Sequence, residues 1–157
     1  MKYTRLTKEQ LEELHPEFAT FLATQSIDAK DWETTKAKSP EVALKVIDVF
    51  SDFIWEKAMD NVNFIDHFSK NHIFLFACKN SKAHSYVVKS NNPGTNFLTQ
   101  EGINWLSENI FSDEIEIQNG FKDFKDNRNQ ELFKLIEKGG IISKGELYKK
   151  LETLLAQ

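Results

Sequence analysis

Residues 63–89 concentrate the side chains of this chain that could do chemistry. The segment holds three of the four histidines, His67, His72 and His84, together with the only cysteine, Cys78. An imidazole beside a thiol can activate a nucleophile, and several imidazoles can bind zinc. Both chemistries need the side chains within a few ångströms of one another, so the pairing of the strands that carry them decides between the possibilities.

The same segment is the most strand-like part of the sequence and predicts an antiparallel meander. Three strands are expected, at residues 64–68, 72–78 and 83–89. A three-residue loop at 69–71, with its last residue left-handed, and a tight turn at 79–82 should connect them. The middle strand is apolar at nearly every position, which predicts a strand covered on both faces.

The second turn sets a register that separates the cysteine from the nearest histidine. If Lys79 faces Lys82, then His84 lies opposite Ala77 and points to the other face of the sheet from Cys78. A nucleophile and its base must lie within hydrogen-bond reach, so this register disfavours the pair. We interpret Cys78 as a buried structural residue.

The first loop predicts that Phe68 faces His72, which also separates the histidines. His67 and His84 then share a face but lie roughly 13 Å apart along the strands. Zinc needs its ligands around one point, and no motif with metal-ligand spacing occurs, so we expect no metal. The sequence also has no P-loop and no GxGxxG, and we expect no cofactor.

One group of chemically useful residues is compatible with this register. His72 faces Lys89, and Asp66 is predicted to lie diagonally across on the same face. A carboxylate, an imidazole and an ammonium group side by side are weak candidates for acid–base work or for holding an anion. A solvated ion-pair network at the end of a sheet is the alternative interpretation.

Charge is distributed unevenly along the chain. The net charge is −4, yet residues 61–98 contain four lysines and one aspartate. A local positive potential favours an acidic or phosphorylated partner. We therefore predict a contact surface at Lys79, Lys82, Lys89 and Tyr86. A pI near 5.6 and the lack of an RNA-binding aromatic motif make nucleic acid the less favoured partner and another protein the expected one.

Helix starts are well marked outside the strands. Pro16 should kink or split the first helix. The acidic residues Asp48, Asp52 and Glu56 are expected on a solvent-facing stripe of the long helix after Pro40. Aromatic residues Trp32, Trp55 and Trp105 are further candidates for an exposed contact surface. The predicted N-caps are Thr7 (with Gln10), Asp28, Ser39, Thr99 and Ser143 (with Glu146).

These elements predict a single α+β domain over residues 1–157. A small antiparallel sheet, the three-strand meander plus an edge strand at 114–118, should pack with about six helices. The sequence leaves open which side of the meander that edge strand joins. One cysteine, no long apolar run and no signal peptide at the N-terminus predict a cytoplasmic protein without a membrane span.

Four phrases of the sequence resemble an uncharacterised family of small proteins from the Bacteroidetes lineage. The resemblance spans nearly the whole chain and implies a bacterial, cytoplasmic setting, but it implies no activity and no catalytic residue. The phrases are LTKEQLEEL (6–14), DVFSDFIWE (48–56), DHFSKN (66–71) and ISKGELYKKLE (142–152).

Three functions are compatible with the sequence. The leading hypothesis is a non-enzymatic protein that binds another macromolecule through a contact surface. The second is an enzyme or small-molecule binder that uses Asp66, His72 and Lys89. The third is an acidic inhibitor or immunity-type protein that blocks a basic effector through its helical faces.

Overall fold

The computed structural model describes residues 1–156, which form two compact units. Unit 1 comprises residues 1–60 and unit 2 begins at residue 61. Within the described residues there are seven helices and a five-stranded antiparallel sheet, so the predicted α+β class is confirmed. That the chain is a single domain stays a prediction. None of the helices in residues 1–156 is both long enough and apolar enough to cross a membrane.

Unit 1 is a small helical unit with an aromatic core. The ring of Phe18 lies 5.2 Å from that of Trp32 and 4.9 Å from that of Phe50. The capping box of Thr7 and Gln10 forms as predicted, and the first helix is split, ending at Glu13 and beginning again at His15, so that Pro16 lies in the first turn of the second part. The helices are α1 (Lys8–Glu13), α2 (His15–Thr24), α3 (Ala29–Lys38) and α4 (Pro40–Asp60).

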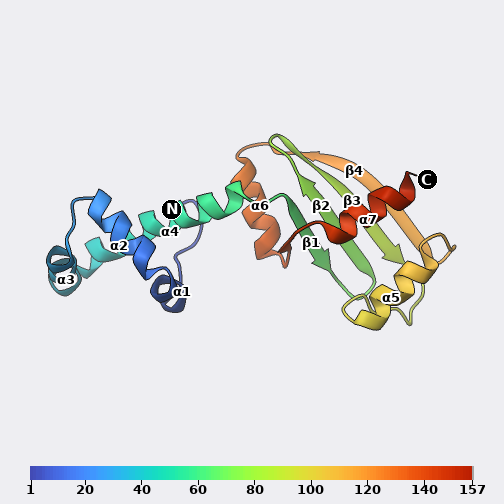
Figure 1. The fold of residues 1–157 in the computed structure, drawn as a ribbon, viewed down its shortest axis with the longest axis horizontal. Helices are drawn as coiled ribbons and strands as arrows, with labels where there is room; N and C mark the ends of the chain where they lie inside the picture. Colours follow the sequence, from blue (N-terminus) through green and yellow to red (C-terminus); the bar gives the residue numbers. More distant parts are fainter. Residues whose placement is uncertain (157) are drawn as a thin grey trace. The chain divides into compact units, whose positions relative to one another are not determined.

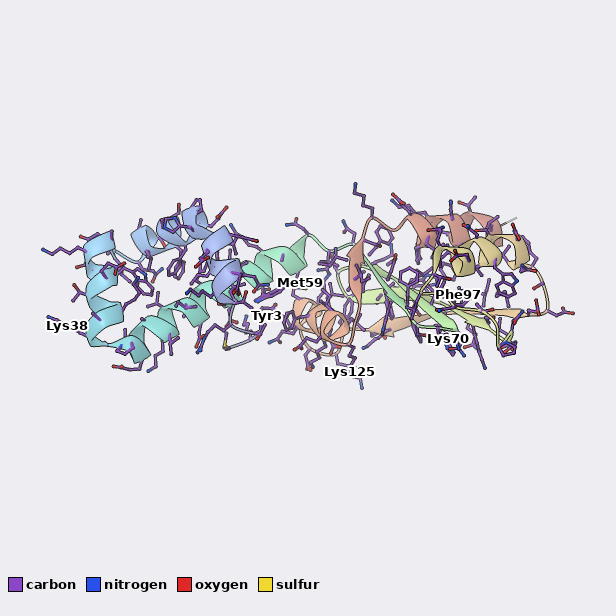
Figure 2. All side chains as sticks on the ribbon, turned by 90° about the horizontal axis from the view of Figure 1, so that it is seen from below. Tyr3, Lys38, Met59, Lys70, Phe97 and Lys125 are labelled. Carbon is purple, nitrogen blue, oxygen red and sulfur yellow. The ribbon has the colours of Figure 1, made fainter. Side chains whose placement is uncertain are left out.

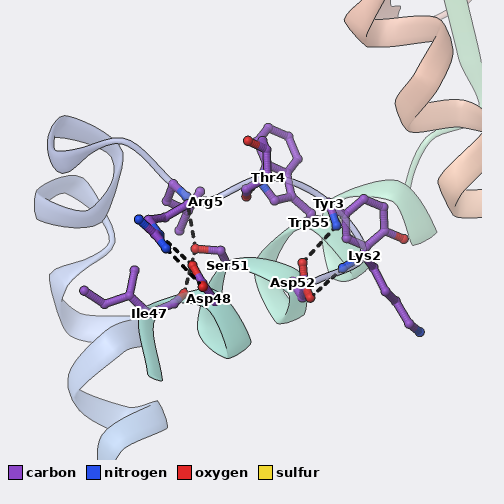
Figure 3. A network of polar contacts seen from close by, with 10 residues as sticks. Lys2, Tyr3, Thr4, Arg5, Ile47, Asp48, Ser51, Asp52 and Trp55 are labelled. Atoms are coloured by element: carbon purple, nitrogen blue, oxygen red, sulfur yellow. Dashed lines mark hydrogen bonds and ion pairs between the residues drawn. The ribbon is translucent and has the colours of Figure 1, made fainter. Parts of the chain in front are cut away.

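The acidic stripe of α4 binds the N-terminal segment, which corrects the prediction of a solvent-facing stripe (Figure 3). Asp52 accepts a hydrogen bond from the backbone N–H of Tyr3 at 3.0 Å, and the Tyr3 hydroxyl donates to Glu56. The Arg5 guanidinium lies 2.6 Å from Asp48 and holds the pKa of that carboxyl below its usual range. Sequence periodicity could not show this, because the partners come from residues about 50 positions earlier.

A buried serine of α4 also connects this helix to the N-terminal segment. Ser51 is fully buried, and its hydroxyl donates to the carbonyl of Ile47 at 2.7 Å. The same oxygen accepts the backbone N–H of Leu6 at 3.0 Å. The hydroxyl therefore satisfies a buried backbone donor that the helix itself cannot reach.

We expect Ser51→Ala to lower the free energy of unfolding of unit 1 by about 1–3 kcal/mol, because the Leu6 N–H would stay buried without a partner. Chemical denaturation followed by tryptophan fluorescence measures this. Thr20→Ala is the matched control, since Thr20 makes the same type of bond to a helix carbonyl four residues back but is exposed. Equal effects of the two substitutions would contradict the role of Ser51.

Unit 2 is built on the antiparallel sheet, whose strand order is β4-β3-β2-β1-β5 (Figure 1). The predicted meander is confirmed, with its first two strands at the predicted bounds. The elements are β1 (Phe64–Phe68), β2 (His72–Cys78), β3 (Lys82–Ser90), α5 (Gln100–Asn109), β4 (Ile115–Asp123), α6 (Arg128–Glu137), β5 (Ile141–Ser143) and α7 (Glu146–Leu155).

The positions of the two outer strands, β4 and β5, show which edges of the sheet are free. β4 is longer than predicted and joins β3, with Ile117 opposite Val88. β5, which the sequence did not predict, joins β1, with Ile142 opposite Ile65. The sheet therefore ends in the outer edges of β4 and β5.

Helices α5 and α7 lie together on one face of the sheet (Figures 1 and 2). Their side chains Leu106 and Tyr148 pack in one cluster with Leu75, Tyr86 and Val88 of the strands. We call this side the covered face. Helix α6 lies on the other side, at one end of the sheet, where the Arg128 guanidinium donates to the carbonyls of Val62 at 2.6 Å and Lys79 at 2.8 Å.

The start of α7 differs from the predicted cap. The helix begins at Glu146 after Gly145, and Ser143 belongs to β5 instead of capping the helix. Gly145 has a φ of 76°, and a β-carbon there would lie 2.5 Å from the ring of Phe64. Only glycine fits such a left-handed position in close contact with a ring.

Candidate functional site

The predicted cluster of Asp66, His72 and Lys89 does not form. His72 does face Lys89, because the second hairpin has the predicted register. In the first hairpin, however, Asp66 faces Leu75, and the carboxylate therefore lies on the covered face while His72 and Lys89 lie on the other.

A shorter turn causes this shift. The backbone N–H of Ser69 bonds to the carbonyl of His72 at 2.9 Å, so the loop has two residues, not the predicted three. Asn71 is not left-handed, since Ser26 is the one non-glycine with positive φ within residues 1–156. One residue fewer in the loop moves every side chain of β1 to the opposite face relative to the prediction.

Asp66 is instead a buried carboxyl with one defined partner. It is 8% exposed, and the Ser143 hydroxyl donates to its Oδ1 at 3.0 Å. Burial raises its pKa, and the hydrogen bond from Ser143 opposes that effect only in part. The residue ties β5 to β1 and contacts neither His72 nor Lys89 across the sheet.

Because the folded state raises the pKa of Asp66, this group stabilises the fold below its usual pKa of about 3.9 and loses that contribution as pH rises through the raised value. We therefore expect Asp66→Asn to increase the free energy of unfolding relative to the native protein more at pH 7 than at pH 4. Urea titrations at both pH values test this. The control is Asp113→Asn, an exposed carboxylate. If the difference in free energy of unfolding between Asp66→Asn and the native protein is the same at both pH values, the raised pKa of Asp66 is contradicted.

Cys78 is buried, as predicted, and its surroundings disfavour the nucleophilic thiolate form. Burial raises the pKa of its thiol to about 11, with only partial opposition from the charge of Arg128. At neutral pH the thiol is protonated, and only the thiolate attacks.

His84 faces Ala77 on the other side of the sheet, also as predicted, and its Nδ1 lies 2.6 Å from the Tyr148 hydroxyl.

The histidines are distributed differently from the prediction. His67 faces Phe74 and lies on the opposite face of the sheet from His84, whereas the sequence placed the two on the same face. Among residues 1–156, no three histidine, cysteine or carboxylate side chains come together in a way that could hold a metal ion.

The four residues of the predicted contact surface do not form one patch. Lys79 and Lys82 flank the turn at one end of the second hairpin, and Lys89 faces His72 at the other end. Tyr86 is only 8% exposed and lies in the core, so it is wrongly predicted as a surface residue.

The tryptophans are not exposed anchors either. Trp32 belongs to the buried core of unit 1, and Trp55 donates from its indole to the carbonyl of Thr4 at 3.0 Å. Trp105 packs against the core of unit 2. Aromatic type alone could not distinguish a surface anchor from a core residue.

The sheet presents a different candidate surface, which we call the open face: the side chains of Phe74, Phe76, Val87, His67 and His72 on the side away from α5 and α7. Both phenylalanines and Val87 are half-buried. Of the helices of unit 2, only α6 lies on this side of the sheet, at one end (Figure 2). The prediction that the middle strand is covered on both faces is therefore wrong. A run of apolar residues indicates burial but cannot show how far the neighbouring helices extend.

Aromatic rings form the centre of the open face. The His72 ring stacks on the Phe74 ring with centroids 5.9 Å apart and an interplanar angle of 10°, and the His67 ring centroid lies 5.8 Å from that of Phe74. His72 Nδ1 donates to the side-chain oxygen of Asn71 at 2.9 Å. These contacts hold the rings in place without covering them, which favours binding without reorganisation of the surface.

Small residues extend the open face toward β4. Ser85 lies opposite Gly120, and a β-carbon at Gly120 would meet no atom within 4 Å. Groups of opposite charge lie near one another around the face. Lys89 lies opposite Glu116, and the Lys122 ammonium lies 3.6 Å from the carboxylate of Glu131. The open face is therefore apolar at its centre, with nearly balanced charge at its rim.

A polar cleft of about 340 Å³ adjoins the open face where Lys89 lies. Its floor is held by a hydrogen bond of 2.8 Å between the buried hydroxyls of Ser90 and Thr95. Two lysines give the cleft positive potential, and the other side chains are mostly hydrogen-bonding groups. The lining residues are Lys70, Asn71, Lys89, Ser90, Asn91, Asn92, Pro93 and Thr95.

Fold and site together define an α+β protein with an antiparallel sheet that α5 and α7 cover on one face, and with no group of three metal-ligating side chains within residues 1–156. The chain belongs to a family of unknown function, DUF6495, whose model matches residues 1–156. Comparison with curated proteins and with solved structures returns no significant match. The family match agrees with the resemblance across nearly the whole chain and adds no activity to it.

Proposed function

We propose that this protein is a non-enzymatic binding protein whose open face contacts another protein. The observation that carries the proposal is the pair of half-buried rings, Phe74 and Phe76, on the face of the sheet that α5 and α7 leave uncovered, with the Phe74 ring stacked against His72. Protein interfaces place aromatic side chains at an apolar centre within a polar rim. This arrangement differs from the basic surface proposed from the sequence, because only Lys89 is common to both.

The balance of charge favours a protein partner over nucleic acid. Residues 61–157 contain 12 basic and 12 acidic side chains, and at the rim Lys89 is opposite Glu116. Binding to a phosphate backbone depends on an excess of unpaired positive charge. The bacterial, cytoplasmic setting is part of the same proposal, and it is supported by the single cysteine and by the sequence phrases similar to a Bacteroidetes family.

We expect Val87→Glu to abolish capture of the partner, because it places a charge at the centre of the apolar surface. Tagged native and variant proteins are compared by pull-down from source cells with nuclease treatment and mass spectrometry. Leu155→Glu is the matched control: it makes the same kind of change at an exposed apolar residue of α7. Circular dichroism establishes that both variants fold.

Three outcomes would contradict the proposal. A partner retained equally by Val87→Glu and the native protein would remove the open face from binding. Loss of the captured material on nuclease treatment would indicate nucleic acid. If Val87→Glu leaves capture unchanged and high salt abolishes it, the hypothesis of an acidic inhibitor is favoured. Residues 1–60 would then be the binding region, because they carry 8 basic and 12 acidic side chains and so account for the whole net charge of −4.

Charge-reversal variants distinguish binding through the open face from binding through the lysines at the turn between β2 and β3. We expect Lys89→Glu to weaken the interaction, because it leaves two carboxylates facing each other at the rim, with Glu116. Lys79→Glu should have little effect, because Lys79 lies at the far end of the hairpin. Affinities of the purified partner for both variants test this, and stronger weakening by Lys79→Glu would support the originally predicted surface instead.

The polar cleft supports a second candidate function, the binding of a small anion between Lys70 and Lys89. The supporting observation is that both lysines line the same space of about 340 Å³. Saturable amide shifts at Asn71 and Asn91 during an NMR titration with inorganic pyrophosphate would favour this function. The absence of shifts, or shifts unchanged in Lys70→Gln, would exclude it.

A further inference from the structure

The outer edge of β4 is an unusually long free edge. β4 has nine residues and, within residues 1–156, pairs only with β3. Phe121, near its end, is 63% exposed although it is a large apolar side chain. Free edge strands present unpaired backbone groups that can pair with another strand, and natural proteins usually shorten or block them. No proline interrupts this one.

The hydrogen bonds at the two ends of the β3–β4 ladder show which residues of β4 direct their backbone N–H and C=O groups away from β3. The Asn91 N–H bonds to the carbonyl of Glu114 at 2.8 Å, and the Phe124 N–H bonds to that of Ser81 at 3.0 Å. Both pairs continue the register of β3 with β4. Because hydrogen-bonded and non-hydrogen-bonded pairs alternate in an antiparallel ladder, the even-numbered residues of β4 bond to β3. The odd-numbered residues, including Asn119, direct their N–H and C=O groups to the free edge.

We propose that two copies of this chain pair through β4, antiparallel and centred on Asn119. Asn119 is the middle residue of the strand and has an outward-facing backbone, so a twofold axis through it aligns backbone groups that are free in each copy. This pairing would extend the sheet from one copy into the other. It is independent of the proposed function, since no residue at the centre of the open face takes part.

The side chains of β4 are self-complementary in this register. Glu116 lies opposite the partner subunit's Lys122 on the side of the open face, and the symmetric pair repeats the contact. Ile117, which is half-buried, lies opposite the partner subunit's Phe121 on the other side, so the exposed Phe121 ring of each copy gains an apolar neighbour. Opposite charges and apolar pairs directly across a ladder are the stabilising cross-strand contacts.

Neighbouring registers lose this complementarity. Shifting the centre to residue 118 places Glu116 opposite the partner subunit's Gly120, and shifting it to residue 120 places Lys122 opposite the partner subunit's Gln118. Only the register centred on Asn119 pairs the two charges and also uses the full length of the strand. In that register Gln118 lies opposite the partner subunit's Gly120, where the space beside the backbone is open.

The mass in solution tests the proposal. We expect sedimentation equilibrium at low salt to show a concentration-dependent rise from 18.2 kDa to twice this mass. Glu116→Lys alone and Lys122→Glu alone should each weaken self-association on the order of tenfold, because like charges then face each other twice. An equimolar mixture of the two variants should recover the dimer, since both facing pairs become opposite in charge. This recovery cannot come from changes inside one copy, such as loss of the contact between Lys122 and Glu131.

A backbone variant provides the second test. Asn119→Pro removes an N–H that points away from β3, so the monomer should fold, as proline is tolerated on edge strands with that orientation. Self-association should be lost. Asn119→Thr keeps the N–H and should dimerise like the native chain. A native protein that stays monomeric up to millimolar concentration would overturn the proposal. So would dimers that persist in Asn119→Pro, or single charge variants that associate as well alone as in the mixture.

Discussion

The pairing of β2 with β3 is the constraint on which unit 2 depends. It places Ile73 opposite Val88 and Leu75 opposite Tyr86, all buried on the covered face, and these pairs form the floor on which α5 and α7 pack. Because side chains alternate along a strand, the same register assigns every second residue to the open face. A shift of one residue would exchange the two sets, exposing the core and burying Lys89.

The two faces of the sheet then have different roles. On the covered face, Tyr148 of α7 contacts Tyr86 at 5.0 Å between ring centroids and bonds to His84, so polar groups there are satisfied within the core. On the open face, Phe74 and Phe76 are only half-buried. Burial of these rings by a partner would remove apolar surface from water, which is the dominant favourable term in association. The fold thus concentrates stability on one side and leaves the other available.

Unit 1 follows a different principle, in which polar side chains of one helix organise a segment without regular structure. Ser51, Asp52 and Asp48 of α4 bind residues near the N-terminus through the backbone and through Arg5. Buried backbone groups need such partners wherever no helix or sheet supplies them. The stripe that periodicity assigns to solvent is therefore occupied by the chain itself.

Whether a structural feature could be predicted from the sequence depends on how far apart in the chain the interacting residues lie. Local signals were sufficient for the cap of Thr7, the split at Pro16 and the register of the second hairpin, since each depends on residues close together in the chain. The candidate site was not predicted in this way, apart from the facing pair of His72 and Lys89. The turn before β2 is shorter than its sequence suggested, and that one residue moved Asp66 to the opposite face.

Only the tertiary structure decided which face the helices cover, where β4 and β5 join the sheet, and which aromatic residues are buried. These depend on contacts between segments far apart in the chain, such as Ile65 with Ile142 and Tyr86 with Tyr148. A strand that is apolar on both faces has the same sequence whether or not a helix lies over it. The residues alone determined that β2 is a central strand, and packing determined that one of its faces remains open.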